Sequence, residues 1–129
     1  MEQDKTSMGM SPNVAGLLSY LLGWITGLVF FFGEKENQFV RFHAMQSIVV
    51  FGAITVIYIV FTIFQSILVA IAFGAGATFL LVVTGFIGLL MTLLGIVSLV
   101  LWILLMIMAY QNSTFKLPIA GNIAEKYVQ

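Results

Sequence analysis

The chain contains no cysteine, and this absence removes several kinds of chemistry at once. Disulfide bonds, catalysis by a thiolate and zinc sites built from cysteine are all excluded. His43 is the only histidine, so a metal site built from several imidazoles is excluded too. The sequence therefore predicts neither a metal ion nor another cofactor.

Charged residues are scarce and unevenly placed. They make up 8% of the 129 residues, against about 25% in soluble domains. Between Phe42 and Phe115 there is no Asp, Glu, Lys or Arg. A soluble fold needs polar faces in contact with water, and this stretch offers none. Because acidic and basic residues balance at zero net charge, we expect no nucleic-acid partner.

What the chain has instead is apolar residues, at 61% of its length. This composition predicts an all-α, polytopic integral membrane protein, with a flexible polar tail over residues 1–13 and one helical membrane domain over 14–129. We predict three transmembrane helices, at about 14–32, 47–73 and 79–110. Gly74 and Gly76 supply the break between the second and third. The alternative, four spans, requires a turn at Gln65-Ser66 and another near Gly85–Gly88, and Gln65-Ser66 is a poor turn signal.

Two polar segments flank these spans. Residues 34–46 form a polar island that predicts a juxtamembrane amphipathic segment, since Glu34, Glu36 and Arg41 are costly within a bilayer. Residues 111–129 predict an interfacial tail, punctuated by Pro118 and Gly121. We expect the tail to fold back onto the first loop through ion pairs, either between Lys116 and Glu34 or Glu36, or between Arg41 and Glu125.

Small residues recur at four-residue spacing in the predicted spans, which favours close packing between helices. One such ridge lies in each span, and the packing positions are Ala15, Ser19, Gly23, Gly27, Thr62, Ser66, Ala70, Gly74, Gly88 and Thr92. These ridges suit a compact bundle or a homo-oligomer.

No catalytic constellation emerges from the polar residues. Ser47 follows His43 by four positions, within reach of a hydrogen bond on a helix, but no third orienting group is visible. We expect instead a histidine bonded to Ser47 or to a loop carbonyl. The chain is therefore predicted not to be an enzyme.

The placement of basic residues predicts an orientation. With three spans, Lys35, Arg41, Lys116 and Lys126 share one side and only Lys5 lies on the other. Positive charge marks the cytoplasmic side, so we expect the N-terminus outside and the C-terminus inside the cell membrane.

Four segments carry a resemblance to a known group of proteins: Asn13–Tyr20 (NVAGLLSY), Phe39–Ser47 (FVRFHAMQS), Ala109–Gln111 (AYQ) and Phe115–Gly121 (FKLPIAG). Together they resemble a family of small uncharacterised prokaryotic membrane proteins grouped with the Tic-twenty-like component of the chloroplast inner-envelope import machinery. The resemblance implies a helical membrane protein with a juxtamembrane segment between its first two spans. It implies no activity, cofactor or catalytic residue, and its plant relatives are linked to protein import.

Two functions are in keeping with this sequence. The first is a non-enzymatic structural or interaction protein with a cytoplasmic loop-and-tail docking surface for a protein partner. The residues of that candidate surface are Glu34, Glu36, Phe39, Arg41, His43, Gln46, Ser47, Lys116, Pro118 and Glu125. The alternative is a channel or accessory subunit in transport or protein translocation, with a path lined by Thr55, Thr62, Ser66, Thr84, Thr92 and Ser98. In both cases the lipid bilayer is the main environment.

Overall fold

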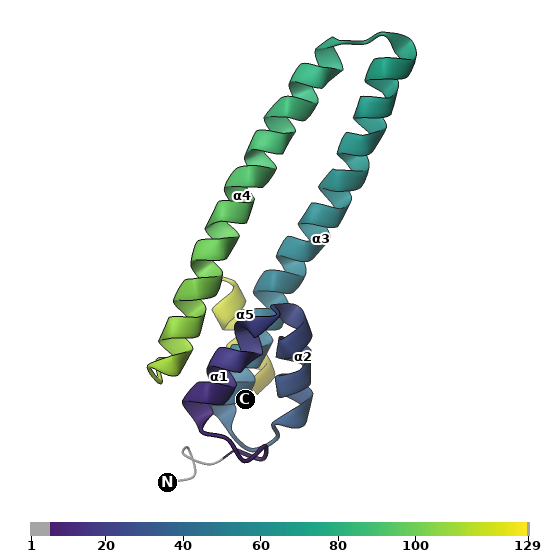
Figure 1. The fold of residues 1–129 in the computed structure, drawn as a ribbon. Helices are drawn as coiled ribbons and strands as arrows, with labels where there is room; N and C mark the ends of the chain where they lie inside the picture. The colour runs from purple at the N-terminus through teal and green to yellow at the C-terminus, as the bar shows by residue number, and fades with distance from the viewer. Residues whose placement is uncertain (1–5, 129) are drawn as a thin grey trace. The chain divides into compact units, whose positions relative to one another are not determined.

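The computed structural model describes residues 6–128, and every regular element in that range is helical (Figure 1). The prediction of an all-α fold is confirmed. The helices are α1 (Pro12–Leu21), α2 (Trp24–Gly33), α3 (Gln38–Ala75), α4 (Phe79–Tyr110) and α5 (Ala120–Val128). The chain divides into two compact units, and each is described by itself. The terminal unit comprises Met1–Ala53 and Val100–Gln129, and the middle unit comprises Ile54–Leu99.

Two helices, α3 and α4, are long and apolar enough to cross a membrane. At 1.5 Å per residue each exceeds the roughly 30 Å of hydrocarbon in a bilayer. Both run without interruption, so the turn at Gln65-Ser66 that four spans require does not form. Helices this long and this apolar are typical of membrane proteins, which agrees with the predicted membrane class.

The first predicted span, residues 14–32, is wrong as a single helix. Gly23 lies between α1 and α2 with a φ of 63°, a left-handed conformation that glycine adopts without strain. Each of the two helices has ten residues. Since ten residues extend only about 15 Å, neither helix crosses a bilayer.

The two short helices form a hairpin in which α1 and α2 contact each other (Figure 1). Gly27 on α2 lies so close to α3 that an added Cβ would be 2.8 Å from the carbonyl oxygen of Ala44. Ala15, Phe30, Val40 and Ala44 form a buried apolar cluster among the three helices. A glycine is needed at position 27 because α2 meets the α3 backbone there.

The N-terminal segment is less free than the sequence indicated. Residues 1–5 of the predicted flexible tail lie outside the described residues. The next residues are fixed: Ser7 donates hydrogen bonds to Glu34 from both its backbone N–H and its hydroxyl. Met8 and Met10 pack against the apolar cluster around Ala15. The described part of this segment therefore belongs to the fold.

In the middle unit, the end of α3 and the start of α4 are joined by a turn at 76–78. Gly76 has a φ of 67°, and the N–H of Thr78 bonds the carbonyl of Gly76. The predicted break in this glycine-containing stretch is confirmed. The hydroxyl of Tyr58 on α3 donates to the carbonyl of Met91 on α4 at 2.6 Å, which links the two helices.

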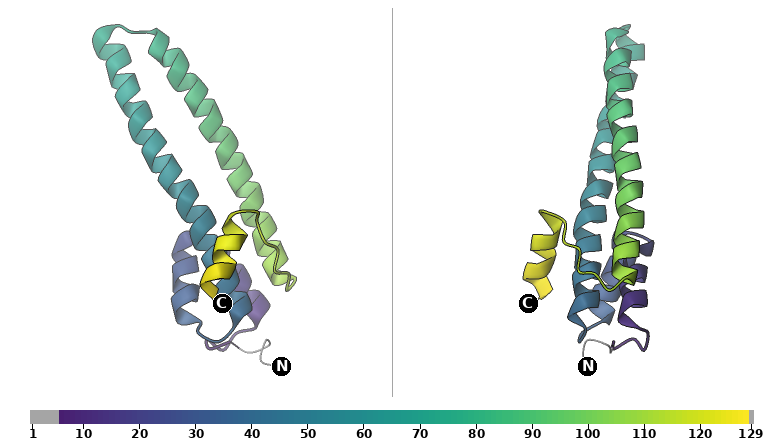
Figure 2. Two further views of the ribbon diagram at one scale, coloured as in Figure 1. Left: turned by 180° about the vertical axis from the view of Figure 1, so that it is seen from behind. Right: turned by 90° about the vertical axis from the view of Figure 1, so that its left-hand side faces the viewer.

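At its other end, α4 terminates in a Schellman motif. Asn112 adopts a left-handed φ of 59°, and its N–H bonds the carbonyl of Ala109. The N–H of Ser113 bonds the carbonyl of Met108, which completes the motif. The chain then turns back toward α3 and ends in α5, drawn in yellow in Figure 2.

The predicted packing ridges differ in what they contact. Ala15, Ser19 and Gly27 are buried in the terminal unit, whereas Gly23 forms the turn. In the middle unit the ridge on α3 and Thr92 on α4 are exposed, and Gly88 lies beside Gln65. The exposed ridge residues on α3 are Thr62, Ser66, Ala70 and Gly74.

Candidate functional site

The first turns of α3 carry three polar side chains into the interior of the terminal unit. His43, Gln46 and Ser47 are all 0% exposed. They occupy positions i, i+3 and i+4, which share one face of a helix. Burying polar groups is costly unless each finds a partner, so their partners determine what the site can do.

His43 uses both ring nitrogens. Its Nε2 lies 2.8 Å from the carbonyl oxygen of Ser113, and its Nδ1 lies 2.7 Å from the hydroxyl of Tyr20. Because a carbonyl only accepts, Nε2 must carry the hydrogen. Nδ1 then accepts from the Tyr20 hydroxyl, and the imidazole is neutral. The prediction of a histidine bonded to a loop carbonyl is confirmed.

Gln46 extends this chain of hydrogen bonds to the C-terminal segment. Its Nε2 donates to the Tyr20 oxygen at 3.0 Å and to the carbonyl of Phe115 at 3.1 Å. Its Oε1 accepts the backbone N–H of Leu117 at 3.1 Å. Both the nitrogen and the oxygen of the Gln46 amide thus bond the C-terminal segment. We call Tyr20, His43 and Gln46, with the backbone groups of Ser113, Phe115 and Leu117, the His43 network.

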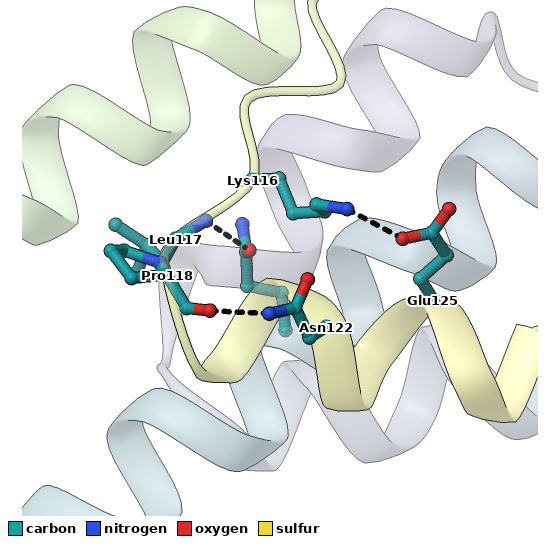
Figure 3. Close-up of polar contacts among 6 residues, drawn as sticks. Lys116, Leu117, Pro118, Asn122 and Glu125 are labelled. Atoms are coloured by element: carbon teal, nitrogen blue, oxygen red, sulfur yellow. Dashed lines mark hydrogen bonds and ion pairs between the residues drawn. The ribbon is translucent and has the colours of Figure 1, made fainter.

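The segment that the network holds is itself ordered by local contacts (Figure 3). Lys116 pairs with Glu125 at 2.7 Å, and the Asn122 side chain donates to the carbonyl of Pro118 at 2.6 Å. Gly121 is buried where a Cβ would crowd Lys116 and the Gln46 oxygen. The tail therefore lies against α3 through close packing and backbone hydrogen bonds.

The predicted ion pairs are not the ones that form. Lys116 pairs within the tail, with Glu125, instead of with the first loop. Arg41 donates from Nη1 to the carbonyls of Phe31 and Glu34, both at 2.8 Å, and its guanidinium lies 4.3 Å from the centre of the Phe31 ring. Arg41, on α3, thus binds the C-terminal end of α2.

Glu34 organises the loop between α2 and α3. Its carboxylate accepts the N–H and hydroxyl of Ser7 and the N–H groups of Glu36 and Asn37, at 2.7 to 3.0 Å. Burial raises the pKa of the Glu34 carboxyl, but these donated bonds outweigh it and leave the pKa below the ordinary 4.5. Asn37 caps α3 by accepting the N–H of Val40. We call Ser7, Glu34 and Asn37 the Glu34 cluster.

The candidate surface residues separate into three groups by burial. Glu34, His43, Gln46 and Ser47 are fully buried, so they shape the fold and do not face a partner directly. Phe39 and Arg41 are partly buried. The exposed members are Glu36, Lys116, Pro118 and Glu125.

The arrangement offers little for catalysis. The Ser47 hydroxyl donates to the carbonyl of Gly23 at 2.8 Å, so it is not activated by His43. Within residues 6–128, no group of three or more acidic or histidine side chains is placed to hold a metal ion. Every buried side-chain nitrogen or oxygen there has a hydrogen-bond partner. The side chains of the His43 network therefore have all their buried polar atoms in hydrogen bonds, as expected of a structural role.

Two residues of these clusters were not singled out from the sequence. Ser7 and Tyr20 each join segments far apart in the chain, since Ser7 bonds Glu34 and Tyr20 bonds His43. Trp102, which by sequence alone could lie inside the bundle or face lipid, donates its indole N–H to the carbonyl of Tyr20 at 2.8 Å. No spacing rule connects such distant positions. A weak signal did exist, because a tyrosine or tryptophan buried among apolar residues needs a hydrogen-bond partner.

Comparison with known proteins gives a consistent match. A family described as the magnetosome magnetite crystal formation protein family, MamF/MmsF, matches residues 3–124. The UPF0132 membrane protein MJ1443 of Methanocaldococcus jannaschii is 41% identical over 97% of this chain and 96% of its own length. A UPF0132 membrane protein of Archaeoglobus fulgidus is 40% identical over 92% of this chain and 97% of its own length.

No solved structure matches this chain. The expected small prokaryotic membrane protein family is found, but none of these matches links the chain to the chloroplast import component. The names of these relatives describe membrane proteins and state no activity.

Proposed function

Because the chain belongs to the MamF/MmsF family of membrane proteins, we propose that it is a non-enzymatic interaction protein whose loop and tail dock a protein partner at the cytoplasmic face of the cell membrane. The observation that carries this proposal is the attachment of the tail to α3. Gln46 and His43 bond three backbone groups about seventy positions away. A tail held in this way presents a fixed set of side chains.

The exposed side chains of these segments suit recognition by a protein. Glu36 in the loop and Lys116, Asn122 and Glu125 in the tail are exposed. Tyr127 on α5 is exposed as well. Tyrosine is enriched in protein–protein interfaces and their rims are polar, so Tyr127 with polar neighbours suits a protein partner.

The charge distribution supports a cytoplasmic location for this surface. A helix that crosses a bilayer leaves its ends on opposite faces, so two crossings by α3 and α4 return the tail to the face of the first loop. Lys35, Arg41, Lys116 and Lys126 all lie in these segments, and the turn at 76–78 has no charge. By the positive-inside rule, the loop and tail are cytoplasmic.

The channel alternative draws less support from the middle unit. Ser66, Thr84, Thr92 and Ser98 each donate to a carbonyl three or four residues earlier on their own helix. Hydroxyl groups used in this way have no hydrogen left for a solute. A transport path would need other groups or further copies of the chain.

Site-specific photocrosslinking tests the docking proposal in intact cells. A photoreactive residue at Asn122 should give a crosslinked product of defined mass, because the side chain faces outward from the ordered tail. The same residue at Thr78, in the turn between α3 and α4, is the control and should give none. Equal products at both positions, or no product at Asn122 together with a strict monomer in detergent, would contradict the proposal.

A further inference from the structure

Gln65 on α3 carries the only side-chain amide between Ile54 and Leu99, the bounds of the middle unit. Its nitrogen lies beside Gly88 on α4, 3.7 Å from the place that a Cβ of residue 88 would take. Within residues 6–128 this amide forms no hydrogen bond. The hydroxyl of the neighbouring Ser66, by contrast, donates to a carbonyl of its own helix. An amide offers two hydrogens and one acceptor oxygen, so Gln65 keeps its whole bonding capacity unused.

The depth of Gln65 makes an unpaired amide unfavourable. Gln65 lies about ten residues, or about 15 Å, from the end of α3 at Ala75. Irregular backbone such as the turn at 76–78 stays outside the hydrocarbon, so Gln65 lies near the middle of a layer roughly 30 Å thick. Acyl chains neither donate nor accept hydrogen bonds, and a polar group among them is stable only when it is paired. The amide therefore requires a polar partner from another molecule.

The surface of α3 beside Gln65 suits close approach by another helix. It carries an exposed ridge of small side chains, namely Thr62, Ser66, Ala70 and Gly74. The opposite side of α3 carries large exposed side chains, namely Val60, Ile67 and Ile71. Small residues allow two helix backbones to come close together within a membrane, and hydrogen bonds between amide side chains strengthen such pairs. The ridge alone would fit any helix, and the unpaired amide beside it selects a partner with a polar group at the same depth.

We propose that two copies of this chain associate through this face of α3 and that their two Gln65 amides bond each other near the bilayer centre. The amide is complementary to itself, because the oxygen of one copy accepts a hydrogen from the nitrogen of the other. Copies inserted with the same orientation hold Gln65 at the same depth, and a two-fold axis along the membrane normal brings the two side chains together. The inference is independent of the proposed docking surface, which lies in the terminal unit.

Energy transfer between labelled copies measures the contribution of the amide. Chains that carry a donor or an acceptor fluorophore at Asn122→Cys are mixed in phosphatidylcholine vesicles over a range of protein-to-lipid ratios. Gln65→Leu should lower the association constant about tenfold, and Gln65→Asn, which keeps an amide, should lower it less. Ser66→Ala is the matched control and should leave the constant unchanged, because that hydroxyl bonds its own helix. An unchanged constant in Gln65→Leu, or a native chain that is monomeric at every ratio, would overturn the inference. Since the contact joins two copies, Gln65→Leu should not destabilise separate copies in dilute micelles.

Disulfide formation supplies the second readout, since the native chain has no cysteine to remove. Thr62→Cys and Val60→Cys make a matched pair, because both positions are exposed at nearly the same depth and they lie on opposite sides of α3. In vesicles, a lipid-soluble oxidant should join Thr62→Cys chains into a dimer and leave Val60→Cys chains single. Dimers of Val60→Cys alone would place the contact on the other side of the helix and overturn the inference. In native membranes, a Thr62→Cys chain crosslinked to a different protein and not to itself would overturn it too.

Discussion

The terminal and middle units use their polar side chains in opposite ways. In the terminal unit, Glu34, His43 and Gln46 bond groups on segments far away in the sequence. In the middle unit, serine and threonine hydroxyls return to carbonyls of their own helix. The hydroxyl of Tyr58 differs, since it bonds the carbonyl of Met91 on the other helix. One unit is thus specified by hydrogen bonds between segments, and the other by helix formation and an apolar surface.

Burial follows the same division. Among the described residues of the middle unit only Ala72 and Thr84 are buried. The terminal unit holds the two apolar clusters around Ala15 and around Tyr20 and Leu105. A segment with few buried side chains gains little from packing in water, so the middle unit depends on lipid. Substitutions should therefore lower the free energy of unfolding more in the terminal unit than in the middle unit.

The largest difference in the free energy of unfolding is expected between two Gln→Leu substitutions on α3. Gln46→Leu removes three hydrogen bonds and leaves the buried Tyr20 oxygen, Phe115 carbonyl and Leu117 N–H without the amide. We expect a loss of about 3 kcal/mol in the free energy of unfolding. Gln65→Leu in the middle unit is the control and should change this free energy by less than about 0.5 kcal/mol. Reversible unfolding in mixed micelles measures both, and equal losses would break the comparison.

A second pair adds one methyl group in each unit. Gly27→Ala places a Cβ 2.8 Å from the Ala44 carbonyl oxygen, so α2 must move away from α3. The expected cost is about 1–3 kcal/mol of unfolding free energy. Gly85→Ala in α4 meets nothing within 4 Å and should be neutral or stabilising by up to about 1 kcal/mol. Thermal melts in detergent report both changes; a stabilised Gly27→Ala variant would show that α2 does not pack on α3.

The Glu34 cluster predicts that the stability of the fold falls at acidic pH. Because the folded pKa of Glu34 lies below 4.5, its stabilisation is complete above pH 4.5 and is lost as pH falls from there through the folded pKa. Glu34→Gln should lower stability at neutral pH by about 1–2 kcal/mol and flatten this part of the pH profile. Glu36→Gln, at an exposed neighbouring position, should leave the profile as in the native chain. An unchanged profile in Glu34→Gln would contradict the assigned role.

The smallest effect is expected at the tail ion pair. The Lys116 and Glu125 side chains are 45% and 49% exposed, and exposed pairs contribute less than about 1 kcal/mol. Lys116→Ala should therefore cost far less stability than Gln46→Leu, although both residues belong to the attachment of the tail. Lys126→Ala serves as the control. A loss at Lys116 equal to that at Gln46 would show that the ion pair, and not the His43 network, holds the tail.

The sequence predicts the two long helices well, and the reason is physical. The uncharged stretch from Phe42 to Phe115 leaves α3 and α4 few alternatives, and Gly76 supplies the turn between them. The hairpin was missed because Gly23 also fits a small-residue ridge with Ser19 and Gly27. Apolar residues alone do not distinguish one crossing helix from two short ones that fold back.

The candidate site was predictable only in its α3 half. His43, Gln46 and Ser47 stand out as polar residues at helical spacing on an apolar segment. Their partners do not, because Tyr20, the Gly23 carbonyl and the tail carbonyls meet them only through the tertiary fold. The burial of Glu34 was likewise hidden, since its donors come from Ser7 and from the backbone.

The central claim is that the chain crosses the membrane twice, with its charged loop and tail on the cytoplasmic face. Maleimide labelling of Glu36→Cys, Thr78→Cys and Asn122→Cys in intact and permeabilised cells tests it directly. The account predicts that an impermeant reagent reaches Thr78→Cys from outside, and reaches Glu36→Cys and Asn122→Cys only after permeabilisation. Labelling of Glu36→Cys or Asn122→Cys in intact cells would contradict it.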